Sequence, residues 1–379
     1  MTRESVPAGV LKSGEERRIL RGHLWAYRNE FETLPEVRDG GVFDLFTPAR
    51  RFICRAFYQA SGGIAGRVLS FHQEKVDGAF LRKRLEQALR LRKRLFPASA
   101  VYRWVYGESD FLPGLVIDRY DSVAVVQSSC AFYQLQRETL ARILLETEAV
   151  ATVAFTGEQG LEVYGQPLCP QVLCFGDLYA QVSWEDAQKT GLFLDQRENW
   201  PVIRRFSGEA VVLDAYCYHG LWGIHAAMAG ARSVIGIDTS ETAIGQARLN
   251  AERNGVRDRC SYEKGRVEQC FESGRTFDVI VLDPPALAKS RGQVKKAMGL
   301  YEDINRKALN ALQPDGILIT CSCSHFITHE VFLEVLKRAA RSVSRPVRVL
   351  EVRGAGPDHP VLPAMPETEY LKCVILQAP

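Results

Sequence analysis

Two short segments in the last third of the chain carry residue types that can do covalent chemistry. Asp283 is followed by two prolines in L-D-P-P-A-L-A-K-S (282–290), and Cys321 and Cys323 stand in I-T-C-S-C-S (319–324). Two prolines stiffen the loop and fix the direction of the carboxylate before them. A thiolate is a strong nucleophile once it is ionised. A nucleophilic thiolate next to a carboxyl group that can exchange a proton is an arrangement suited to covalent catalysis.

The D-P-P segment resembles the fourth motif of nucleic-acid methyltransferases that act on a flipped base. Enzymes that methylate an exocyclic amine usually place an aromatic residue directly after the prolines, where this chain has Ala286. Carbon 5 of cytosine is not nucleophilic until a thiolate adds to carbon 6. Cys323 fits the nucleophile and Asp283 fits the group that binds N3. A lone C-x-C is more often structural, and the paired motifs favour catalysis.

Strands and helices that alternate from about residue 188 must position these groups. Short apolar runs predict strands, amphipathic runs predict helices at 224–230 and 241–255, and the alternation predicts a parallel, doubly wound α/β sheet. The predicted strands cover 211–215, 233–238, 260–264, 278–283 and 316–321. Two more strands, 346–353 and 370–377, end the chain without an intervening helix, as in class I methyltransferases.

Ligands bind at the carboxyl ends of such strands, where Asp214 and Asp238 end the first two. A carboxylate after the second strand accepts hydrogen bonds from a ribose diol, which predicts an adenosine-containing cofactor. The turn A-Y-C-Y-H-G-L-W-G (215–223) has Gly220 and Gly223 but lacks the third glycine that a dinucleotide pyrophosphate requires. The pattern favours S-adenosylmethionine over NAD, the alternative being a tight turn without a ligand.

The first third of the chain has the pattern of a nucleic-acid-binding module. Residues 1–110 hold 20 Lys and Arg against 13 Asp and Glu, whereas the remainder holds 28 against 32. Strands predicted at 41–48, 51–58 and 61–71 form a small β domain. Cations and flat rings before them, which suit RNA, are Arg17, Arg18, Arg21, His23, Trp25 and Tyr27. The alternative is an amphipathic element with Trp25 in the core.

A basic helix is predicted over residues 77–96, where leucines recur at helical spacing. Its cations predict contact with phosphates, and a solvated helix face is the alternative. We name Arg82, Lys83, Arg90 and Lys93 as RNA-binding candidates. Residues 101–185 predict a small α+β domain, with a hairpin at 115–127, a helix at 135–146 and strands at 160–165 and 178–184. No chemistry is identified there.

Composition excludes several classes of protein. Of 379 residues, 46% are hydrophobic and 25% charged, which excludes a disordered or collagen-like chain. No apolar run approaches the ~18–20 residues that span a bilayer, and the N-terminus lacks the apolar core of a secretory signal. The ten cysteines form no C-x-x-C pair and no zinc-ligand spacing. We therefore expect a cytoplasmic protein with no membrane partner and no metal.

Taken together, these motifs resemble the bacterial 23S ribosomal RNA 5-methylcytosine methyltransferases with an N-terminal PUA domain, over nearly the whole chain. The segment 11–27 is similar to the start of the PUA domain and 107–121 to the family's middle domain. The segment K-T-G-L-F-L-D-Q-R-E-N (189–199) is similar to the entry into the methyltransferase domain, Y-E-D-I-N (301–305) to the helix start after the D-P-P loop, and 358–372 to the tail.

The resemblance implies roles for individual residues. Cys323 corresponds to the nucleophile, and Asp283 to its acidic partner. Cys321 stands where the family often has another residue. The resemblance implies cofactor or substrate contacts for Asp195, Gln196 and Arg197. The other cofactor-binding candidates, which stand at the strand ends and in the first turn, are Asp214, Tyr216, Gly220, Asp238 and Thr239. The chain departs from the family at His219 and Leu221 in the first cofactor turn, at Gly265 and Arg266 after the third strand, and at Leu287.

The sequence thus predicts three parts: a PUA-like RNA-binding domain (1–75), a basic helix with a small α+β domain (76–186), and a Rossmann-like class I methyltransferase domain (187–379) with a terminal β-hairpin. The predicted reaction moves a methyl group from S-adenosyl-L-methionine to C5 of a cytosine in 23S ribosomal RNA through an adduct at Cys323. The alternatives are methylation of an adenine or guanine amine, and a non-catalytic RNA-binding assembly factor.

Overall fold

The structure is a computed structural model that describes residues 6–157, 160–184, 190–288 and 290–379. Lys189 and Lys289, which belong to two of the motifs above, lie outside these ranges. The chain forms two compact units, one made of Met1–Cys169 with Pro357–Thr368 and the other of Pro170–Gly356 with Glu369–Pro379. The predicted boundaries after residues 75 and 186 stay predictions.

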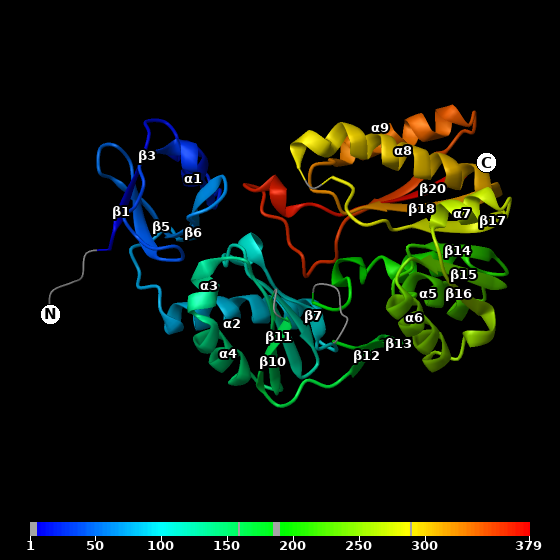
Figure 1. The fold of residues 1–379 in the computed structure, drawn as a ribbon, viewed down its shortest axis with the longest axis horizontal. Helices are drawn as coiled ribbons and strands as arrows, with labels where there is room; N and C mark the ends of the chain where they lie inside the picture. The colour runs from blue at the N-terminus through cyan, green and yellow to red at the C-terminus, as the bar shows by residue number, and fades with distance from the viewer. Residues whose placement is uncertain (1–5, 158–159, 185–189, 289) are drawn as a thin grey trace. The chain divides into compact units, whose positions relative to one another are not determined.

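The first unit begins with a six-stranded sheet of order β2-β6-β5-β4-β1-β3 (Figure 1). Its pairs are antiparallel except β1 with β4. Apolar side chains that alternate along the strands fill its core together with Ile19 of the short helix α1. The elements are β1 (Ala8–Leu11), α1 (Glu16–Leu20), β2 (Trp25–Tyr27), β3 (Phe31–Thr33), β4 (Val42–Phe46), β5 (Phe52–Tyr58) and β6 (Ile64–Ser70).

A five-stranded sheet of order β11-β10-β9-β8-β7 follows, packed against three helices. The sequence analysis missed β7 and β10, because most of their side chains are buried and show no alternation. Asp77 caps α2 by accepting from the backbone N–H of Ala79 and Phe80. The elements are α2 (Gly78–Leu95), β7 (Val101–Tyr106), β8 (Val116–Tyr120), β9 (Val123–Gln127), α3 (Ala131–Leu135), α4 (Arg137–Leu145), β10 (Thr152–Gly157) and β11 (Gly160–Gly165).

The second unit opens with the hairpin β12 (Gln171–Phe175) and β13 (Leu178–Val182), of which only the later strand was predicted. Its main sheet has seven strands in the order β16-β15-β14-β17-β18-β20-β19. The strands are β14 (Val211–Ala215), β15 (Ser233–Asp238), β16 (Cys260–Lys264), β17 (Phe277–Leu282), β18 (Leu312–Ser322), β19 (Arg348–Arg353) and β20 (Lys372–Ala378). The first five are mutually parallel, and β20 runs antiparallel to both neighbours.

Helices cover both faces of this sheet, with α5 and α6 over one and α8 and α9 over the other (Figure 1). The core between α8, α9 and the sheet is apolar, with Tyr301 and Phe332 packed edge to face. The helices are α5 (Leu221–Met228), α6 (Glu241–Arg253), α7 (Val267–Glu272), α8 (Val294–Ala311) and α9 (His329–Ser342). The predicted doubly wound sheet is confirmed.

The last two strands are not joined by a simple hairpin turn. They pair antiparallel as predicted, but the chain leaves the second unit after Gly356 and returns at Glu369. The residues between them, Pro357–Thr368, pack into the first unit, where Met365 is fully buried beside Leu24. We call Pro357–Thr368 the crossover segment. Sequence periodicity did not indicate it because its partners lie more than 250 residues earlier.

Candidate cofactor and catalytic site

A cavity of about 410 Å³ opens at the carboxyl ends of the five parallel strands β14 to β18. Residues that follow each of these strands contribute to its wall, which is the position expected for a ligand in an open α/β sheet. Predicted site residues that line it are Asp195, Gln196, Tyr216, Asp238, Thr239, Asp283 and Cys323. Three other candidates, Arg197, Asp214 and Gly220, are not among the lining residues.

The turn after β14 is tight enough to require both of its glycines. Gly220 has φ +75°, and a Cβ there would lie 2.6 Å from the hydroxyl oxygen of Tyr262. A Cβ on Gly223 would lie 2.8 Å from Val234 and 3.1 Å from Asp214 Oδ2. The departure from the family at His219 and Leu221 therefore leaves the turn itself intact. α5 starts three residues earlier than predicted, directly after Gly220.

Asp214 supports this turn from beneath. It is fully buried, and its Oδ2 accepts a hydrogen bond of 2.9 Å from the backbone N–H of Gly223. Its Oδ1 has no hydrogen-bond partner among the residues that the structure describes. Burial raises the pKa of Asp214 to about 7, and the nearby Asp283 and Asp238 carboxylates add to the rise.

Asp238 stands at the end of β15 with its carboxylate at the cavity wall. Backbone N–H groups hold it in place, because Oδ1 accepts from Ser240 at 2.9 Å and Oδ2 from Tyr218 at 3.1 Å. Each carboxylate oxygen has a second acceptor site. The group can therefore accept hydrogen bonds from two vicinal hydroxyls, as a ribose offers.

The wall after β16 contains an acid that the sequence analysis overlooked. Gly265 and Arg266 follow this strand, and the residues that reach the cavity also include Val267 and Glu268. The acid that the family resemblance leads one to expect directly after the third strand is therefore absent from that position, and Glu268 supplies an acid from the first turn of α7. Burial raises the pKa of Tyr216 across the cavity, and the charge of Glu268 contributes to that rise. A signal was available, since Glu268 is the first acid after the strand.

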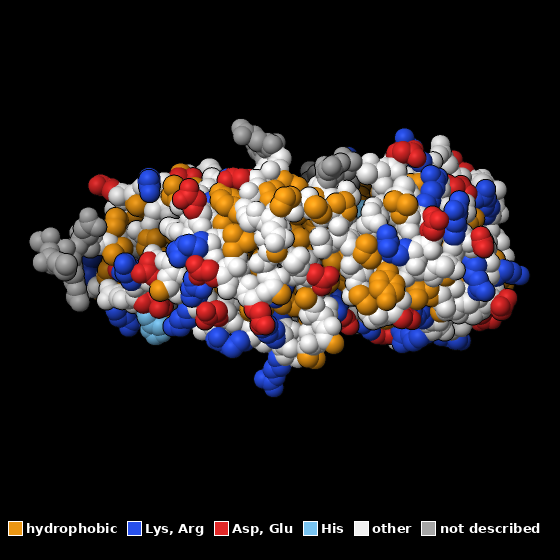
Figure 2. Space-filling view, turned by 90° about the horizontal axis from the view of Figure 1, so that it is seen from below, with side chains coloured by type: hydrophobic (Ala, Val, Ile, Leu, Met, Phe, Trp, Pro, Cys, Tyr) orange, Lys and Arg blue, Asp and Glu red, His pale blue; other side chains and the backbone are white. Residues whose placement is uncertain are grey.

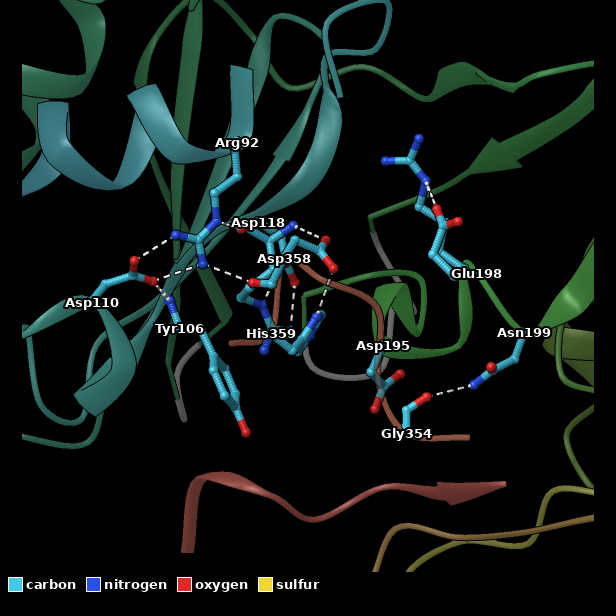
Figure 3. A network of polar contacts seen from close by, with 12 residues as sticks. Arg92, Tyr106, Asp110, Asp118, Asp195, Glu198, Asn199, Gly354, Asp358 and His359 are labelled. Atoms are coloured by element: carbon cyan, nitrogen blue, oxygen red, sulfur yellow. Dashed lines mark hydrogen bonds and ion pairs between the residues drawn. The ribbon is translucent and has the colours of Figure 1, made fainter. Parts of the chain in front are cut away.

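The short turn Leu194–Gln196 delivers two polar side chains to the cavity. Gln196 Nε2 donates to Asp283 Oδ2 at 3.0 Å, and Asn199 Nδ2 donates to Gln196 Oε1 at 2.7 Å, which fixes the amide orientation. Asn199 also donates to the carbonyl of Gly354 at 3.0 Å (Figure 3). Asp195 accepts from the Tyr370 hydroxyl through Oδ2, while its buried Oδ1 has no partner in the described part of the chain.

Arg197 turns away from this group. Its Nε lies 3.4 Å from the carboxylate of Glu198, and its guanidinium lies 5.7 Å from the ring centre of Phe175. The structure therefore brings Asp195 and Gln196 to the cavity wall but places Arg197 against the β12–β13 hairpin.

Asp283 and Cys323 face the same cavity from neighbouring strand ends. Asp283 Oδ2 accepts from Gln196 and, at 3.4 Å, from Trp222 Nε1. Enclosure by protein atoms raises the pKa of Asp283 to about 7, with the charge of Asp195 as a further cause. Cys323 Sγ lies 3.9 Å from the carbonyl oxygen of Pro284. A thiol and a carboxyl that can hold a proton near neutral pH thus share one cavity.

Cys321 cannot take the place of Cys323. It is fully buried inside β18, directly opposite Cys373 of β20. Residues two apart in a strand point to the same face, so Cys323 can point elsewhere than Cys321 only because the strand has ended before it. β18 ends at Ser322, so Cys323 is the first residue free to turn into the cavity.

A serine ties the two catalytic loops together. Ser324 Oγ accepts from the backbone N–H of Leu287 at 3.0 Å and of Ala288 at 3.1 Å. The Tyr301 hydroxyl lies 3.0 Å from Ser324 Oγ and accepts from Ser322 Oγ at 3.0 Å. This gives Tyr301, which opens the Y-E-D-I-N motif, a function as a buried link behind the site. The sequence analysis noted the motif but not this contact.

Comparison with known proteins places this site in a family. Residues 10–71 match the model of a PUA-like domain, and residues 207–350 match that of a methyltransferase domain. The chain is 34% identical to ribosomal RNA large subunit methyltransferase I of Aeromonas salmonicida, over 97% of this chain and 98% of that one. The corresponding Klebsiella pneumoniae protein is 33% identical over 98% of both chains. The chain belongs to the ribosomal RNA large subunit methyltransferase I family.

Solved structures agree on the fold. A protein classed as a methyltransferase and crystallised with SAH has a TM-score of 0.88 at 19% identity, over 98% of this chain and 99% of that chain. A protein from Streptococcus mutans that is classed as a SAM-dependent methyltransferase has a TM-score of 0.86 at 18% identity, again over 98% of this chain and 99% of that chain. The predicted family, the fold class and S-adenosylmethionine as methyl donor are confirmed.

The cavity fits this cofactor. Asp238 presents acceptors for the ribose hydroxyls. Asp195 presents a buried carboxylate oxygen that has no partner among the described residues and can accept from an ammonium group. Tyr216 and Val267 line the same cavity and supply apolar surface that suits an adenine ring. These groups would hold S-adenosylmethionine in this member of the methyltransferase I family.

Of the basic residues named from the sequence, some are exposed to solvent and others lie close to a carboxylate. Arg17, Arg21, Lys83 and Arg90 are exposed. Arg18 forms an ion pair of 2.6 Å with Glu30, Arg82 pairs with Glu146, and Lys93 lies 3.7 Å from Glu148. On the face shown in Figure 2, Lys and Arg side chains are mixed with Asp and Glu. Trp25, one of the aromatic candidates, is partly buried and donates its indole N–H to Glu108.

A hollow of about 320 Å³ lies beside the first turn of α2. Three cations border it against one acid, and its lining residues are Gly78, Ala79, Arg82, Lys83, Glu86, Arg142 and Ile143. Arg142 comes from α4 and was not identified from the sequence, because its neighbours there are apolar. No helix in the described ranges is long and apolar enough to cross a membrane, and they hold no group of three metal-binding side chains.

Proposed function

We propose that this methyltransferase modifies C5 of a cytosine in large-subunit ribosomal RNA through a covalent adduct at Cys323. The observation that carries the proposal is the shared cavity wall of Cys323 and Asp283, fixed by the contacts of Ser324 and Gln196. The relatives at 33–34% identity are named as large-subunit ribosomal RNA methyltransferases, which supports the substrate class.

The proposed reaction uses this chain's groups in order. Cys323 Sγ, as the thiolate, bonds to C6 of the cytosine, and the electron pair of the C5–C6 double bond moves toward C5. C5 then bonds to the electrophilic methyl group that bound S-adenosylmethionine would supply, and the donor would leave as the neutral thioether S-adenosylhomocysteine. Loss of the C5 proton to a base then restores the double bond and expels the sulfur. The negative charge that thiolate addition places on the ring is stabilised at N3 by the hydrogen bond that protonated Asp283 donates.

Asp283 suits that donation because its pKa of about 7 leaves a large protonated fraction at neutral pH. The hydrogen bond from Gln196 favours the ionised form and so limits the rise. The rate of adduct formation should therefore fall as the pH rises above about 7, after correction for thiol ionisation. Replacing Gln196 with Leu should move that fall to higher pH.

The cofactor and RNA contacts complete the proposal. Cofactor contacts are assigned to Asp195, Gln196, Tyr216, Asp238 and Thr239, while Asp214 and Gly220 shape the turn beneath them. RNA phosphates are assigned to the exposed cations Arg17, Arg21, Lys83 and Arg90, and to Arg82 beside the basic hollow. Arg18 and Lys93 remain proposals of the same kind, as does a cytoplasmic location.

The test compares wild type, Cys323→Ala and Cys321→Ala with labelled S-adenosylmethionine and ribosomal RNA that this enzyme has not methylated. The expected result is labelled 5-methylcytosine from wild type and Cys321→Ala, and none from Cys323→Ala. Label on an adenine or guanine amine, or activity that survives without Cys323, would replace the covalent route with direct amine methylation. Cofactor binding without any transfer would point to an assembly factor.

A further inference from the structure

Lys372, the first residue of β20, is a buried cation that the proposed reaction does not yet use. Its side chain belongs to the interior of the second unit, with 2% of the residue exposed. Nζ donates to the carbonyl oxygens of Tyr370 at 2.6 Å and Ser324 at 2.7 Å. No carboxylate lies within 4.0 Å of it among the described residues. A buried ammonium without an anion is costly, so a negative charge should be close by in the working state.

Cys323, which lies between Ser322 and Ser324 at the same strand end, can supply that charge through its sulfur. Lys372 pairs with Ser322 across the antiparallel strands, and its contact with Ser324 spans the residue between them, which is Cys323. Burial lowers the pKa of Lys372 to about 8, and negative charge on Cys323 acts in the opposite direction, ahead of Glu369. The ammonium and the thiolate thus stabilise each other electrostatically.

Among the described residues, other charged and titratable groups near this strand end have contacts of their own. Cys321 and Cys373 are fully buried, and burial keeps the pKa of Cys321 well above its usual value, so it stays a neutral thiol. Asp195 is engaged by the Tyr370 hydroxyl, and Asp283 by Gln196. His325 lies with its ring 5.0 Å from that of Tyr370, and Glu369 lies 3.2 Å from His329.

We propose that Lys372 is a positioning residue that holds Cys323 as a thiolate aimed at the cavity. Its ammonium stabilises the charge on sulfur, and its contact with the carbonyl of Ser324 ties the loop that carries Cys323 to the start of β20. The S–H bond breaks, the proton passes to water, and the nitrogen keeps its own three protons throughout. The inference rests on the proposed role of Cys323 and assigns to the same site the group that activates it.

The experiment measures the rate of Cys323 alkylation by iodoacetamide from about pH 6 to about pH 10. Mass spectrometry of the peptide that carries Cys323 separates it from the exposed Cys169 and Cys174. The variants are Lys372→Gln, which retains hydrogen-bond donors but no charge, and Lys372→Arg, which retains both. Lys337→Gln is the control, because it removes a charge from a side chain of α9 that is 76% exposed.

In wild type, the midpoint of the alkylation profile should lie below about 8.5, the ordinary value for cysteine. Lys372→Gln should raise that midpoint by about one pH unit or more, whereas Lys372→Arg and Lys337→Gln should leave it near wild type. A merely structural role would change the rate equally at every pH with no shift of the midpoint, and that result would overturn the proposal.

A wild-type midpoint at or above that of free cysteine would overturn it as well, even if Lys372→Gln did not fold. Circular dichroism and calorimetric binding of S-adenosylhomocysteine check that each variant is folded. The alkylation profile requires neither RNA nor methyl transfer. It therefore distinguishes a failure of the Lys372 assignment from a failure of the cytosine-C5 reaction, which the labelling assay detects separately.

Discussion

Ser324 Oγ accepts hydrogen bonds from the backbone N–H of Ala288, 36 residues earlier in the chain, and of its neighbour Leu287. The contact joins the loop that presents Cys323 to the loop that presents Asp283. Both loops follow parallel strands, but parallel strands fix only where their ends lie, not how the following loops turn. A single buried hydroxyl therefore links the two loops that carry the reactive groups.

Ser324→Ala should therefore lower both activity and stability. One buried and one partly buried backbone N–H group would lose their acceptor, at a cost of about 1–3 kcal/mol in the free energy of unfolding. Urea unfolding measures this cost, and single-turnover assays measure the expected fall in methyl transfer. Ser342→Ala is the matched control, because its hydroxyl contacts only its own helix at the surface. Equal effects of the two substitutions would contradict the role assigned to Ser324.

Asp214 should make the protein less stable as the pH rises. Its folded-state pKa of about 7 exceeds the unfolded value of about 3.9, so the folded state binds more protons between these values. The cost begins above about pH 4 and is complete above about pH 7. Asp214→Asn keeps an acceptor for the Gly223 N–H and removes the charge. The variant should gain about 1–3 kcal/mol at pH 8 and nothing at pH 4, in urea unfolding.

The sequence predicted the site to the extent that strand ends determine it. Asp238, Asp283 and Cys323 each follow a parallel strand, and the carboxyl ends of parallel strands meet at one edge, so their proximity could be expected. The contacts that orient them could not be expected. Gln196 reaches Asp283 across 87 residues and Tyr370 reaches Asp195 across 175, and no local pattern encodes such pairs.

The charge pattern of α2 indicated a basic helix, but it did not indicate which of the cations face solvent. Arg92 and Arg90 are chemically alike in the sequence, but helix rotation buries Arg92 completely and leaves Arg90 in solvent. Composition counts both as cations on a basic helix. Which one is structural depends on Asp110, a partner supplied by tertiary packing. The crossover segment was missed likewise, because its contacts are all long-range.

Gly220 and Gly230 offer a matched pair of substitutions to alanine. Both have positive φ, +75° and +92°, so both should lose about 1 kcal/mol from backbone strain. At Gly220 the new Cβ would also meet the Tyr262 hydroxyl at 2.6 Å, whereas at Gly230 nothing lies within 4 Å. Calorimetry with S-adenosylhomocysteine should show at least about tenfold weaker binding for Gly220→Ala and wild-type binding for Gly230→Ala.

Arg92 should be essential for stability and not for binding RNA. Its guanidinium is fully buried and pairs with both carboxylate oxygens of Asp110, and it also donates to the carbonyl of Asp358 at 2.7 Å (Figure 3). Arg92→Gln would leave Asp110 buried without its counter-charge, at a cost of about 3–5 kcal/mol. The exposed Arg90→Gln should change the free energy of unfolding by less than about 0.5 kcal/mol. Thermal unfolding of the two variants makes the comparison.

Lys83 and Arg90 should contribute to RNA binding through charge alone. Each neutralised phosphate releases counterions, so replacing both cations with Gln should reduce the slope of log affinity against log salt by about two. The control removes two charges from α9, by Lys337→Gln with Arg341→Gln, both exposed. Filter binding of a ribosomal RNA fragment at several salt concentrations gives the slopes. If the α2 and α9 variants lose affinity equally, net charge rather than the basic helix explains the binding, and the phosphate contacts assigned to α2 are wrong.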